Sequence, residues 1–591
     1  MHRTLLITIA VAAGCAPRSG PPEPAPTAPP APAPVAMPAA GVAGPDLDQR
    51  LAALSLRDRI AQLVMPWMAG NYAAYDDWSF AETVRLVDSQ HVGGVIVSVG
   101  SPLDIAARLN WLQSRSALPL LVASDLEGGT AIRLEGGTAF PSNMGVGAAG
   151  RDSDAYAMGR ITAEEGRAVG IQMAFAPVAD VNSNPANPII NTRSFGEDPR
   201  AVARLVAAEV RGLEEHGMAA TAKHFPGHGD TDTDSHLGLA VVPADWARLD
   251  TLELVPFRAA IAAGVTAVMS AHVALPALDA GQRRPGTVLP AILTGLLRDS
   301  LQFHGLVVTD ALSMGALVNT YGATEAPVLA LLAGADLLLQ PADPAATIDA
   351  VERAVRDGRV SQARIDRSVR KILALKERLG LFERRTVALD SIPRVVGSEE
   401  HLRTALDVAE RSVVLLADDG ALDSLRARPR RITVVAYGDE GNPVVGPMLA
   451  QELRAAGDTV SLVRLWPASG PASLDSARAA LRASPFTVFA VAIRAVPWRG
   501  GIGMPDGLAA LIDGSAPGRT VLVSLGSPYI IAQTPHVRSY LIGWAANPLT
   551  ETAVARALSG AAIGGRLPIR VPPAYPVGAG LDRPGSARAP H

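Results

Sequence analysis

Eight short apolar segments, separated by stretches with helical periodicity, constrain the fold of this chain more than any other feature. They occupy residues 61–66, 94–99, 120–124, 173–177, 219–223, 266–270, 306–309 and 335–339. Continuous apolar strands that alternate with helices are typical of a parallel sheet buried on both faces. The pattern predicts an α/β fold in which residues 46–385 close into a (β/α)8 barrel of the TIM type.

A second, smaller set of elements follows the predicted barrel. Residues 386–400 are interpreted as a linker, and six further apolar segments lie at 412–416, 432–437, 459–465, 487–493, 521–525 and 540–544. Together with a helical pattern at 446–456, they predict a smaller, open α/β domain over residues 400–577. Residues 578–591, rich in Gly, Pro, Ala and Arg, are predicted to form a disordered tail.

The first 45 residues have the composition of an export signal followed by a spacer. A basic start, an apolar run at 4–13 and a Gly14-Cys15 junction resemble a bacterial lipobox, so residues 1–15 predict a lipoprotein-type signal peptide lipidated at Cys15. The run is shorter than the roughly 20 residues of a membrane-spanning helix. Residues 16–45, dominated by Pro and Ala, predict an extended linker. The alternative is an ordinary signal peptide with an incidental cysteine.

This N-terminus predicts an extracytoplasmic protein that a lipid anchor holds to the cell membrane, at the periplasmic face or the outer membrane. Ala16 follows Cys15 where many lipoproteins of the inner membrane have Asp. Cys15 is the single cysteine, which excludes an intramolecular disulfide. The net charge of -4 is small for 591 residues, so the composition indicates no nucleic-acid partner.

Polar side chains follow five of the predicted strands, at the end where a TIM barrel carries its active site. They are Asp125 with Glu127, Asp180, Lys223 with His224, His272, and Asp310. A single polar residue in a loop means little, but five positions in register with one barrel predict a common site.

The segment 223–236, KHFPGHGDTDTDSH, holds three of the chain's 11 histidines. His and Asp can bind Zn²⁺, but the spacing lacks an HExxH pattern and the segment reads as a loop, which disfavours a metal site. A solvated polar loop is a second interpretation. Acid/base chemistry is favoured, because Asp234 and His236 lie on the same side of an extended backbone and a carboxylate raises the pKa of an imidazole.

This segment resembles the K-H-F-P-G-H-G-D-T-x-x-D-S-H signature of the β-N-acetylglucosaminidase branch of glycoside hydrolase family 3. Residues 123–129 followed by Arg133 are similar to the family's D-Q-E-G-G-R-V-x-R segment. Residues 191–196 are similar to its N-x-R-S-F/Y-G turn, and residues 308–314 to its nucleophile segment. The resemblance is strong over about 50–385 and weaker over 400–575, where the family often has an α/β sandwich domain.

The resemblance implies a role for each matched residue. Asp310 would be the nucleophile, His236 the general acid/base and Asp234 the residue that orients it. The sugar hydroxyls would be bound by Asp125, Arg133, Arg193, Lys223 and His224. A retaining glycosidase needs an attacking carboxylate and a proton donor, and an imidazole suits proton transfer near neutral pH. No metal and no cofactor are implied. Glu127 is interpreted as structural, His228 as shaping the loop and His272 as lining the pocket.

The function predicted from these residues is a retaining exo-β-N-acetylglucosaminidase. It would release terminal non-reducing N-acetylglucosamine from peptidoglycan fragments or chitooligosaccharides. The alternatives are a family 3 β-glucosidase, an N-acetylglucosaminide phosphorylase and, in another class, a non-catalytic glycan-binding surface lipoprotein. The Asp234-Ser235-His236 element favours the first reading over β-glucosidases, which take their acid from elsewhere. Thr130 and Leu126 depart from the family pattern, where Arg and Gln are usual. Trp466, Trp498 and Trp544 could stack on sugars or belong to a core.

Overall fold

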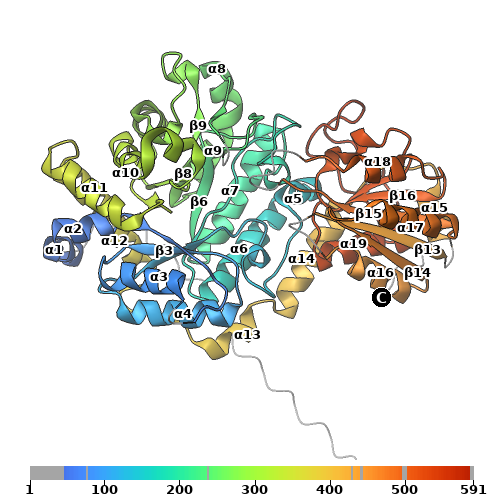
Figure 1. Ribbon diagram of the computed structural model, residues 1–591, viewed down its shortest axis with the longest axis horizontal. Coiled ribbons are helices and arrows are strands. Elements are labelled where there is room, and N and C mark those ends of the chain that lie inside the picture. Colours follow the sequence, from blue (N-terminus) through green and yellow to red (C-terminus); the bar gives the residue numbers. More distant parts are fainter. Residues whose placement is uncertain are drawn as a thin grey trace, which may run out of the picture. The chain divides into compact units, whose positions relative to one another are not determined.

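The computed structural model describes residues 45–74, 77–235, 238–427, 430–439, 444–495 and 502–585 (Figure 1). The predicted lipidation site Cys15 and the predicted acid/base His236 lie outside the described residues, as does most of the 16–45 linker. Within the described part of the chain, no helix combines the length and the apolar character needed to cross a membrane.

A closed parallel barrel forms the N-terminal part of the described chain (Figure 1). One sheet joins, in spatial order, β2 (Trp67–Met68), β3 (Gly94–Val97), β4 (Leu121–Ser124), β5 (Met173–Ala174), β6 (Ala219–Phe225), β8 (Ala267–Ser270) and β10 (Leu306–Thr309). The circle closes through β1 (Val64–Met65), which precedes β2 and pairs with β11 (Leu338–Leu339). A parallel bridge between Val308 and Leu337 joins β11 to β10. The predicted TIM-type barrel is therefore confirmed, with a strand in each of the eight predicted segments.

Helices follow the strands and cover the outside of the barrel. They are α3 (Trp78–Asp88), α4 (Pro102–Arg115), α5 (Asn143–Ala149), α6 (Asp152–Ala168), α7 (Pro199–Glu215), α9 (Leu254–Ala262), a π-helix (Ala291–Ser300), α10 (Gly315–Ala333), α11 (Pro344–Arg356) and α12 (Gln362–Arg378), with α1 (Pro45–Ala53) and α2 (Leu56–Ala61) before the first strand. The start of α7 shows how the sequence sets such a boundary. Asp198 accepts hydrogen bonds from the backbone N–H groups of Arg200 and Ala201, and Pro199 occupies the first turn, where no helical donor is lost.

The second part of the chain is a sheet with helices on both faces (Figure 1). Its strands are β12 (Val414–Ala417), β13 (Arg431–Gly438), β14 (Thr459–Leu465), β15 (Phe486–Ala492), β16 (Thr520–Ser524) and β17 (Tyr540–Ile542), in the order β12-β17-β16-β15-β13-β14. Only β12 runs antiparallel to its neighbour among these pairs. Alternate strand residues enter two separate cores: Val434 packs with α14 (Glu399–Ser412), α16 (Pro447–Ala455) and α19 (Pro548–Ser559), whereas Val435 packs with α18 (Asp506–Asp513). This is the predicted α/β sandwich.

The disorder predicted for residues 578–591 is wrong for residues 578–585. The backbone N–H of Arg583 donates to the carbonyl of Ile563 at 2.9 Å, and that of Leu581 donates to Leu415 at 2.7 Å. The Arg583 guanidinium also pairs with the buried Asp418 at 2.9 Å. Composition suggested disorder, but these backbone and charge contacts fix the segment against β12. Residues 586–591 lie outside the described part.

Lys376 on α12 is fully buried, and its Nζ donates to the Gln62 side-chain oxygen at 2.7 Å. Burial lowers the pKa of Lys376 to about 7. Because the unfolded chain binds this proton up to about pH 10.4, the folded state gains stability as pH rises from 7 to 10. We expect Lys376→Met to raise the free energy of unfolding by about 2 kcal/mol at pH 7 and below, and by less above pH 10. Denaturant titrations across this range test it; a variant less stable than the wild type at pH 7 would contradict it.

Candidate active site

Three strands of the barrel place charged groups at one mouth. Asp125 follows β4, Lys223 lies in β6 and Asp310 follows β10, as the sequence predicts. Lys223 Nζ lies 3.0 Å from Asp125 Oδ1, although β5 separates their strands. Neighbouring strands lie about 5 Å apart, so the end residues of β4 and β6 approach one another where the barrel closes over its centre. These residues therefore face the inside of the barrel at the carboxyl ends of the strands.

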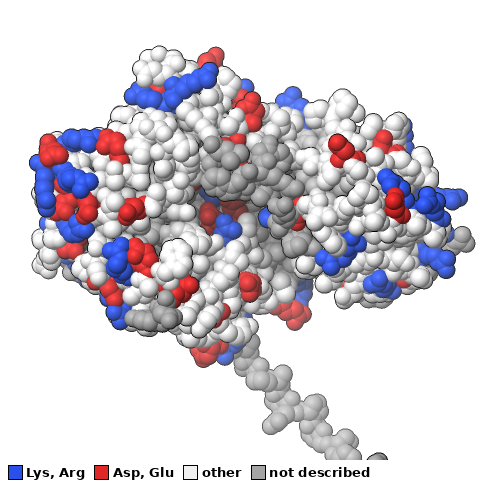
Figure 2. Space-filling model, viewed as in Figure 1, with Lys and Arg blue, Asp and Glu red and all other residues white. Residues whose placement is uncertain are grey.

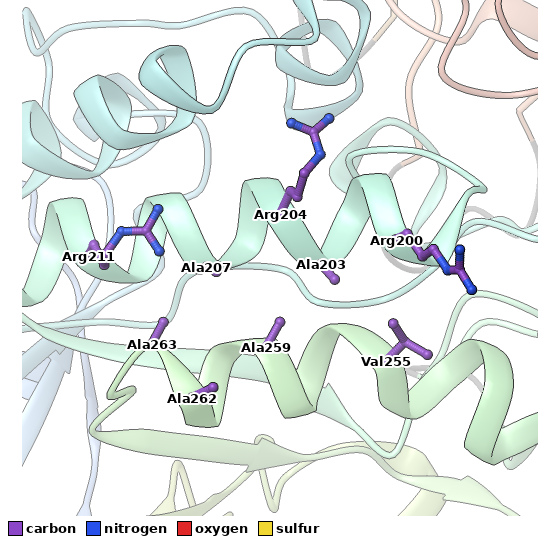
Figure 3. Close-up of a pocket in the computed structure, with 9 residues that line it drawn as sticks. All are labelled: Arg200, Ala203, Arg204, Ala207, Arg211, Val255, Ala259, Ala262 and Ala263. Atoms are coloured by element: carbon purple, nitrogen blue, oxygen red, sulfur yellow. The ribbon is translucent and has the colours of Figure 1, made fainter.

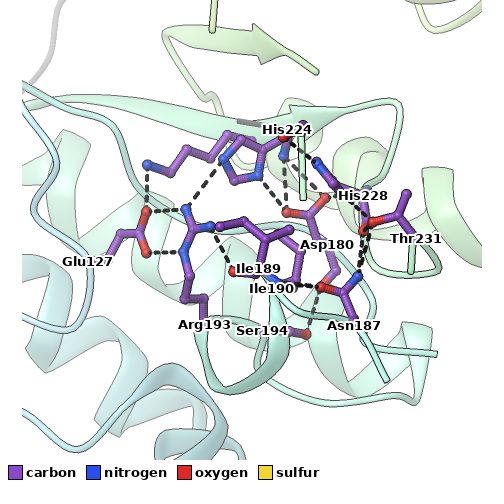
Figure 4. Close-up of polar contacts among 12 residues, drawn as sticks. Glu127, Asp180, Asn187, Ile189, Ile190, Arg193, Ser194, His224, His228 and Thr231 are labelled. Carbon is purple, nitrogen blue, oxygen red and sulfur yellow. Dashed lines mark hydrogen bonds and ion pairs between the residues drawn. The ribbon is translucent and has the colours of Figure 1, made fainter. Parts of the chain in front are cut away.

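Glu127 is the central acceptor of this cluster. Its carboxylate accepts from the Lys223 ammonium at 2.6 Å and from both Nε and Nη2 of Arg193 at 2.9 and 2.8 Å (Figure 4). Burial raises the pKa of Glu127, but the charges of Arg193 and Lys223 outweigh it and hold that pKa well below the usual range. Burial likewise lowers the pKa of Lys223, but Asp125 and Glu127 reverse the shift and raise it. All of these groups are therefore charged at neutral pH.

Arg193 reaches the cluster from the long loop after β5. It ends a short 3-10 turn (Asn191–Arg193), and its Nη1 donates to the carbonyl of Ile189 at 3.1 Å. Its own carbonyl accepts from the Asn143 amide at 2.7 Å. With Glu127 holding the other guanidinium edge, the side chain is fixed in one orientation, as a residue that positions sugar hydroxyls requires.

His224 lies between Arg193 and a buried acid (Figure 4). Its Nδ1 is 2.7 Å from Asp180 Oδ2, and its Nε2 is 3.4 Å from Arg193 Nη2. Asp180 is completely buried and also accepts the backbone N–H of His228 at 2.7 Å. A carboxylate on Nδ1 fixes the tautomer, so Nε2 is the nitrogen turned toward the remaining site residues.

Arg133 completes the predicted binding set at its edge. Its Nη2 lies 3.4 Å from Asp125 Oδ2, and both side chains are partly exposed. Burial raises the pKa of Asp125, but Lys223 and Arg133 outweigh it and lower that pKa. The structure thus brings all five predicted binding residues together around this mouth.

The loop after β6 is held by a chain of buried hydrogen bonds. His228 Nδ1 lies 2.7 Å from Thr231 Oγ1, and its Nε2 lies 3.0 Å from Ser235 Oγ. Burial lowers the pKa of His228 to about 4, so the ring is neutral at pH 7. This agrees with the interpretation of His228 as a residue that shapes the loop. Asp234, the predicted orienting acid, is buried in the same loop.

Asp310 lies at the end of β10 and is partly exposed toward the mouth. Its backbone N–H donates to Ser270 at 3.2 Å, and Oδ1 accepts the N–H of Ala311 at 2.8 Å. His272 is buried behind this peptide: its Nε2 lies 3.0 Å from the Ala311 carbonyl, and its Nδ1 lies 2.8 Å from Thr287 Oγ1. His272 therefore supports the backbone that carries Asp310.

Thr130, one of the two departures from the family pattern, has a structural partner. Its hydroxyl donates to the buried Glu165, which also accepts from Thr138 Oγ1 at 2.6 Å and lies 2.8 Å from His401 Nδ1. Burial lowers the pKa of His401, but the neighbouring carboxylates of Glu164 and Glu165 outweigh this effect and raise the pKa to about 9. This buried cluster joins the loop that carries Arg133 to α14 at the start of the second part.

Two acids of this site have partners that the sequence does not reveal. Glu127, interpreted as structural, pairs with both Lys223 and Arg193, so its structural role is to position those two cations. Asp180 was noted after its strand without a role, yet it is the partner of His224. Asp180 follows β5 at the site end of the barrel, which was the available signal. Trp544 is fully buried and donates to the Ser412 carbonyl at 2.7 Å, so it belongs to a core.

Other charged features of the surface lack this organisation. Basic and acidic side chains are interspersed among uncharged areas on the face in Figure 2. A hollow on the outside of the barrel runs between α7 and α9 (Figure 3). Alanines, Val255 and three arginines line it, without a carboxylate. Among the described residues, no group of three or more His, Cys, Asp or Glu is arranged to hold a metal ion.

Comparisons with known proteins agree with the geometry. The model of the glycosyl hydrolase family 3 N-terminal domain matches residues 55–375. A β-N-acetylglucosaminidase/β-glucosidase of Cellulomonas fimi is 36% identical over 363 residues, which cover 60% of this chain and 64% of the relative. β-Hexosaminidase A of Pseudoalteromonas piscicida is 33% identical over 402 residues, which cover 64% of each protein. The chain thus spans less than two thirds of each of these relatives.

Solved structures extend the similarity to the second part of the chain. A family 3 β-N-acetylglucosaminidase from Paenibacillus sp. str. FPU-7 superposes with a TM-score of 0.80 at 35% identity, covering 88% of this chain and 99% of that one. A β-glucoside phosphorylase, BglX, superposes with a TM-score of 0.77 at 25% identity, and the match covers 88% of this chain and 95% of that one. The similarity therefore includes both the barrel and the sandwich.

Proposed function

Because this chain belongs to glycoside hydrolase family 3, we propose that it is a retaining exo-β-N-acetylglucosaminidase. The observation that carries the proposal is the charged cluster of Asp125, Glu127, Arg193 and Lys223 at the barrel mouth. Fixed donors and acceptors at this mouth suit the hydroxyls of one terminal sugar. The name of the Paenibacillus relative supports N-acetylglucosamine as that sugar, whereas the name of the Cellulomonas relative gives both N-acetylglucosaminidase and β-glucosidase activity.

In the first chemical step, an Asp310 oxygen attacks the anomeric carbon while the bond to the leaving oxygen breaks. The imidazolium of His236, oriented by Asp234, gives its proton to that oxygen. Water then attacks the same carbon, the ester bond to Asp310 breaks, and the imidazole takes a proton from the water. Ala311 N–H donates to Asp310 Oδ1 at 2.8 Å, which helps to hold the carboxylate in one orientation at the end of β10.

The substrate is drawn from peptidoglycan fragments or chitooligosaccharides outside the cytoplasm. The lipobox-like sequence at Cys15 supports this location, which metabolic labelling with a fatty acid tests. Similarity to a phosphorylase makes phosphate a second candidate acceptor in place of water. In that case the product is N-acetylglucosamine 1-phosphate, and turnover with phosphate exceeds turnover without it.

The test compares hydrolysis of para-nitrophenyl β-N-acetylglucosaminide with that of the β-glucoside, with and without phosphate. We expect kcat/KM to favour the N-acetyl substrate at least about tenfold, because a site built for the acetamido group leaves polar groups unpaired without it. Preference for the glucoside would replace the proposal by a β-glucosidase. Absence of turnover on both substrates would favour a glycan-binding role.

A further inference from the structure

Trp67 is an exposed aromatic side chain at the carboxyl end of the first barrel strand. It is 45% exposed, whereas its strand neighbour Met68 is 2% exposed. Nearly half of the Trp67 surface therefore remains in solvent, and an exposed aromatic surface at the mouth of a site can bind ligand.

The strand register shows which way Trp67 points. Trp67 is paired with Ile96 on β3, and Ile96 is paired with Ala123 on β4. Paired residues on neighbouring strands project to the same face of a sheet, and residues two apart along a strand do so as well. Ala123 is two residues before Asp125, which faces the inside of the barrel. Trp67 therefore projects to the same inner side at the mouth.

The strand order places Trp67 across the mouth from Lys223 and His224. Counting round the barrel from β1 and β2 through β3, β4 and β5, β6 is the fifth of eight positions. Lys223 and His224 lie on β6, so they stand opposite the first strand. Between the two sides, Asp310 follows β10. A terminal sugar held by the β4–β6 side would direct its next ring toward Trp67.

The loops around Trp67 are tied to the loop of Arg133. Ser98 N–H donates to Met68 at 3.0 Å, and Gly100 N–H donates to the Arg133 carbonyl at 3.0 Å. The Arg108 guanidinium fixes the segment after Trp67 by donating to the Ala69 carbonyl at 2.8 Å. These loops carry three more exposed apolar side chains, Tyr72, Val99 and Ile132. The apolar rim is thus held in place beside the polar pocket.

We propose that Trp67, with this rim, is the specificity-determining platform for the first sugar ring of the leaving group. A β-linked pyranose with equatorial substituents presents an apolar face of axial C–H groups, which an indole covers while leaving the hydroxyls in water. The substrates so selected are β-linked oligosaccharides, in preference to glycosides with small leaving groups. The inference rests on the proposed function and names the leaving group that the same site prefers.

The test compares two substrates that share the terminal sugar: N,N′-diacetylchitobiose and methyl β-N-acetylglucosaminide. We expect Trp67→Ala to lower the ratio of their kcat/KM values about tenfold, because the indole contacts only the second ring. Trp67→Phe should retain most of the ratio, since an aromatic face remains. Trp466→Ala tests the other exposed tryptophan that could stack on sugars, which is 49% exposed and follows β14 in the sandwich. A loss of the ratio in Trp466→Ala but not in Trp67→Ala would refute the platform.

Each outcome separates the platform from the proposed function. If the wild type cleaves neither substrate, the proposed function fails, and the platform with it. If Trp67→Ala lowers both kcat/KM values equally, with an unchanged melting temperature, Trp67 serves the terminal sugar and the platform is refuted. If the alanine variant does not fold, the phenylalanine and leucine variants decide: a platform requires a higher ratio for phenylalanine than for leucine.

Discussion

Asp310→Ala is expected to lower kcat for β-N-acetylglucosaminide hydrolysis by about 10⁴-fold or more. The substitution removes the carboxylate that would form the bond to the anomeric carbon, and it leaves the ion pairs of Lys223 with Asp125 and Glu127 in place. Because the Ala311 N–H remains and Asp310 is partly exposed, the fold should be retained. Initial rates with the para-nitrophenyl substrate, together with the melting temperature, measure both effects.

The matched control for this variant is Asp232→Ala. Asp232 is an exposed acid of the loop after β6, hydrogen-bonded to its neighbour Thr233 at 3.1 Å. The Asp232→Ala variant should change kcat by less than about twofold. Added azide should restore turnover in Asp310→Ala by attacking the anomeric carbon directly, giving the α-azide. A residual rate above about 1% of the wild type, without azide, would contradict a nucleophilic role for Asp310.

Glu127→Gln is expected to have the second-largest effect, on both stability and activity. The change leaves Lys223 and Arg193 buried with one carboxylate partner fewer, which costs about 3–5 kcal/mol of unfolding free energy at pH 7. It also loosens the guanidinium and ammonium groups that would bind the sugar. We therefore expect kcat/KM to fall about 100-fold, mainly through KM.

The stability difference between the wild type and Glu127→Gln should depend on pH, whereas a general packing defect would give a difference that does not. The pKa of Glu127 is depressed in the folded state, so its contribution is full above the unfolded pKa of about 4.3 and is lost as pH falls below it. The stability difference between wild type and variant should therefore shrink below pH 4. Glu325→Gln, in an exposed pair with Arg359, should cost less than about 1 kcal/mol. Equal effects of the two variants would refute the role assigned to Glu127.

The barrel strands and their order along the chain could be predicted from the sequence, because a strand that is buried on both faces has a continuous apolar sequence. β6 and β10 illustrate this, as their predicted segments contain the observed strands. The second sheet was equally predictable in its strands. The antiparallel direction of β12 was not, since pairing direction depends on partners far along the chain. The tail beyond Gly578 was mistaken for disorder because its partners, such as Asp418, are also distant in sequence.

The site was predictable where a charged residue directly follows a strand, as Asp125 and Asp310 do. Arg193 was found only through the family resemblance, because its loop after β5 carries no local sign of where it folds. The role of Glu127 could not be read from sequence, since it depends on cations from two other segments meeting one carboxylate. Trp67 has no sequence signal at all; its significance follows from register and exposure.

The measurement that tests the central claim most directly is the identity of the residue that carries the sugar during turnover. The protein is mixed with a fluorinated N-acetylglucosaminyl fluoride that slows release of the intermediate, quenched in acid, digested and analysed by mass spectrometry. The account predicts one added fluoro-N-acetylglucosaminyl group on the peptide that contains Asp310, absent in Asp310→Ala. An adduct on another residue, or full turnover with no adduct at any quench time, would contradict it.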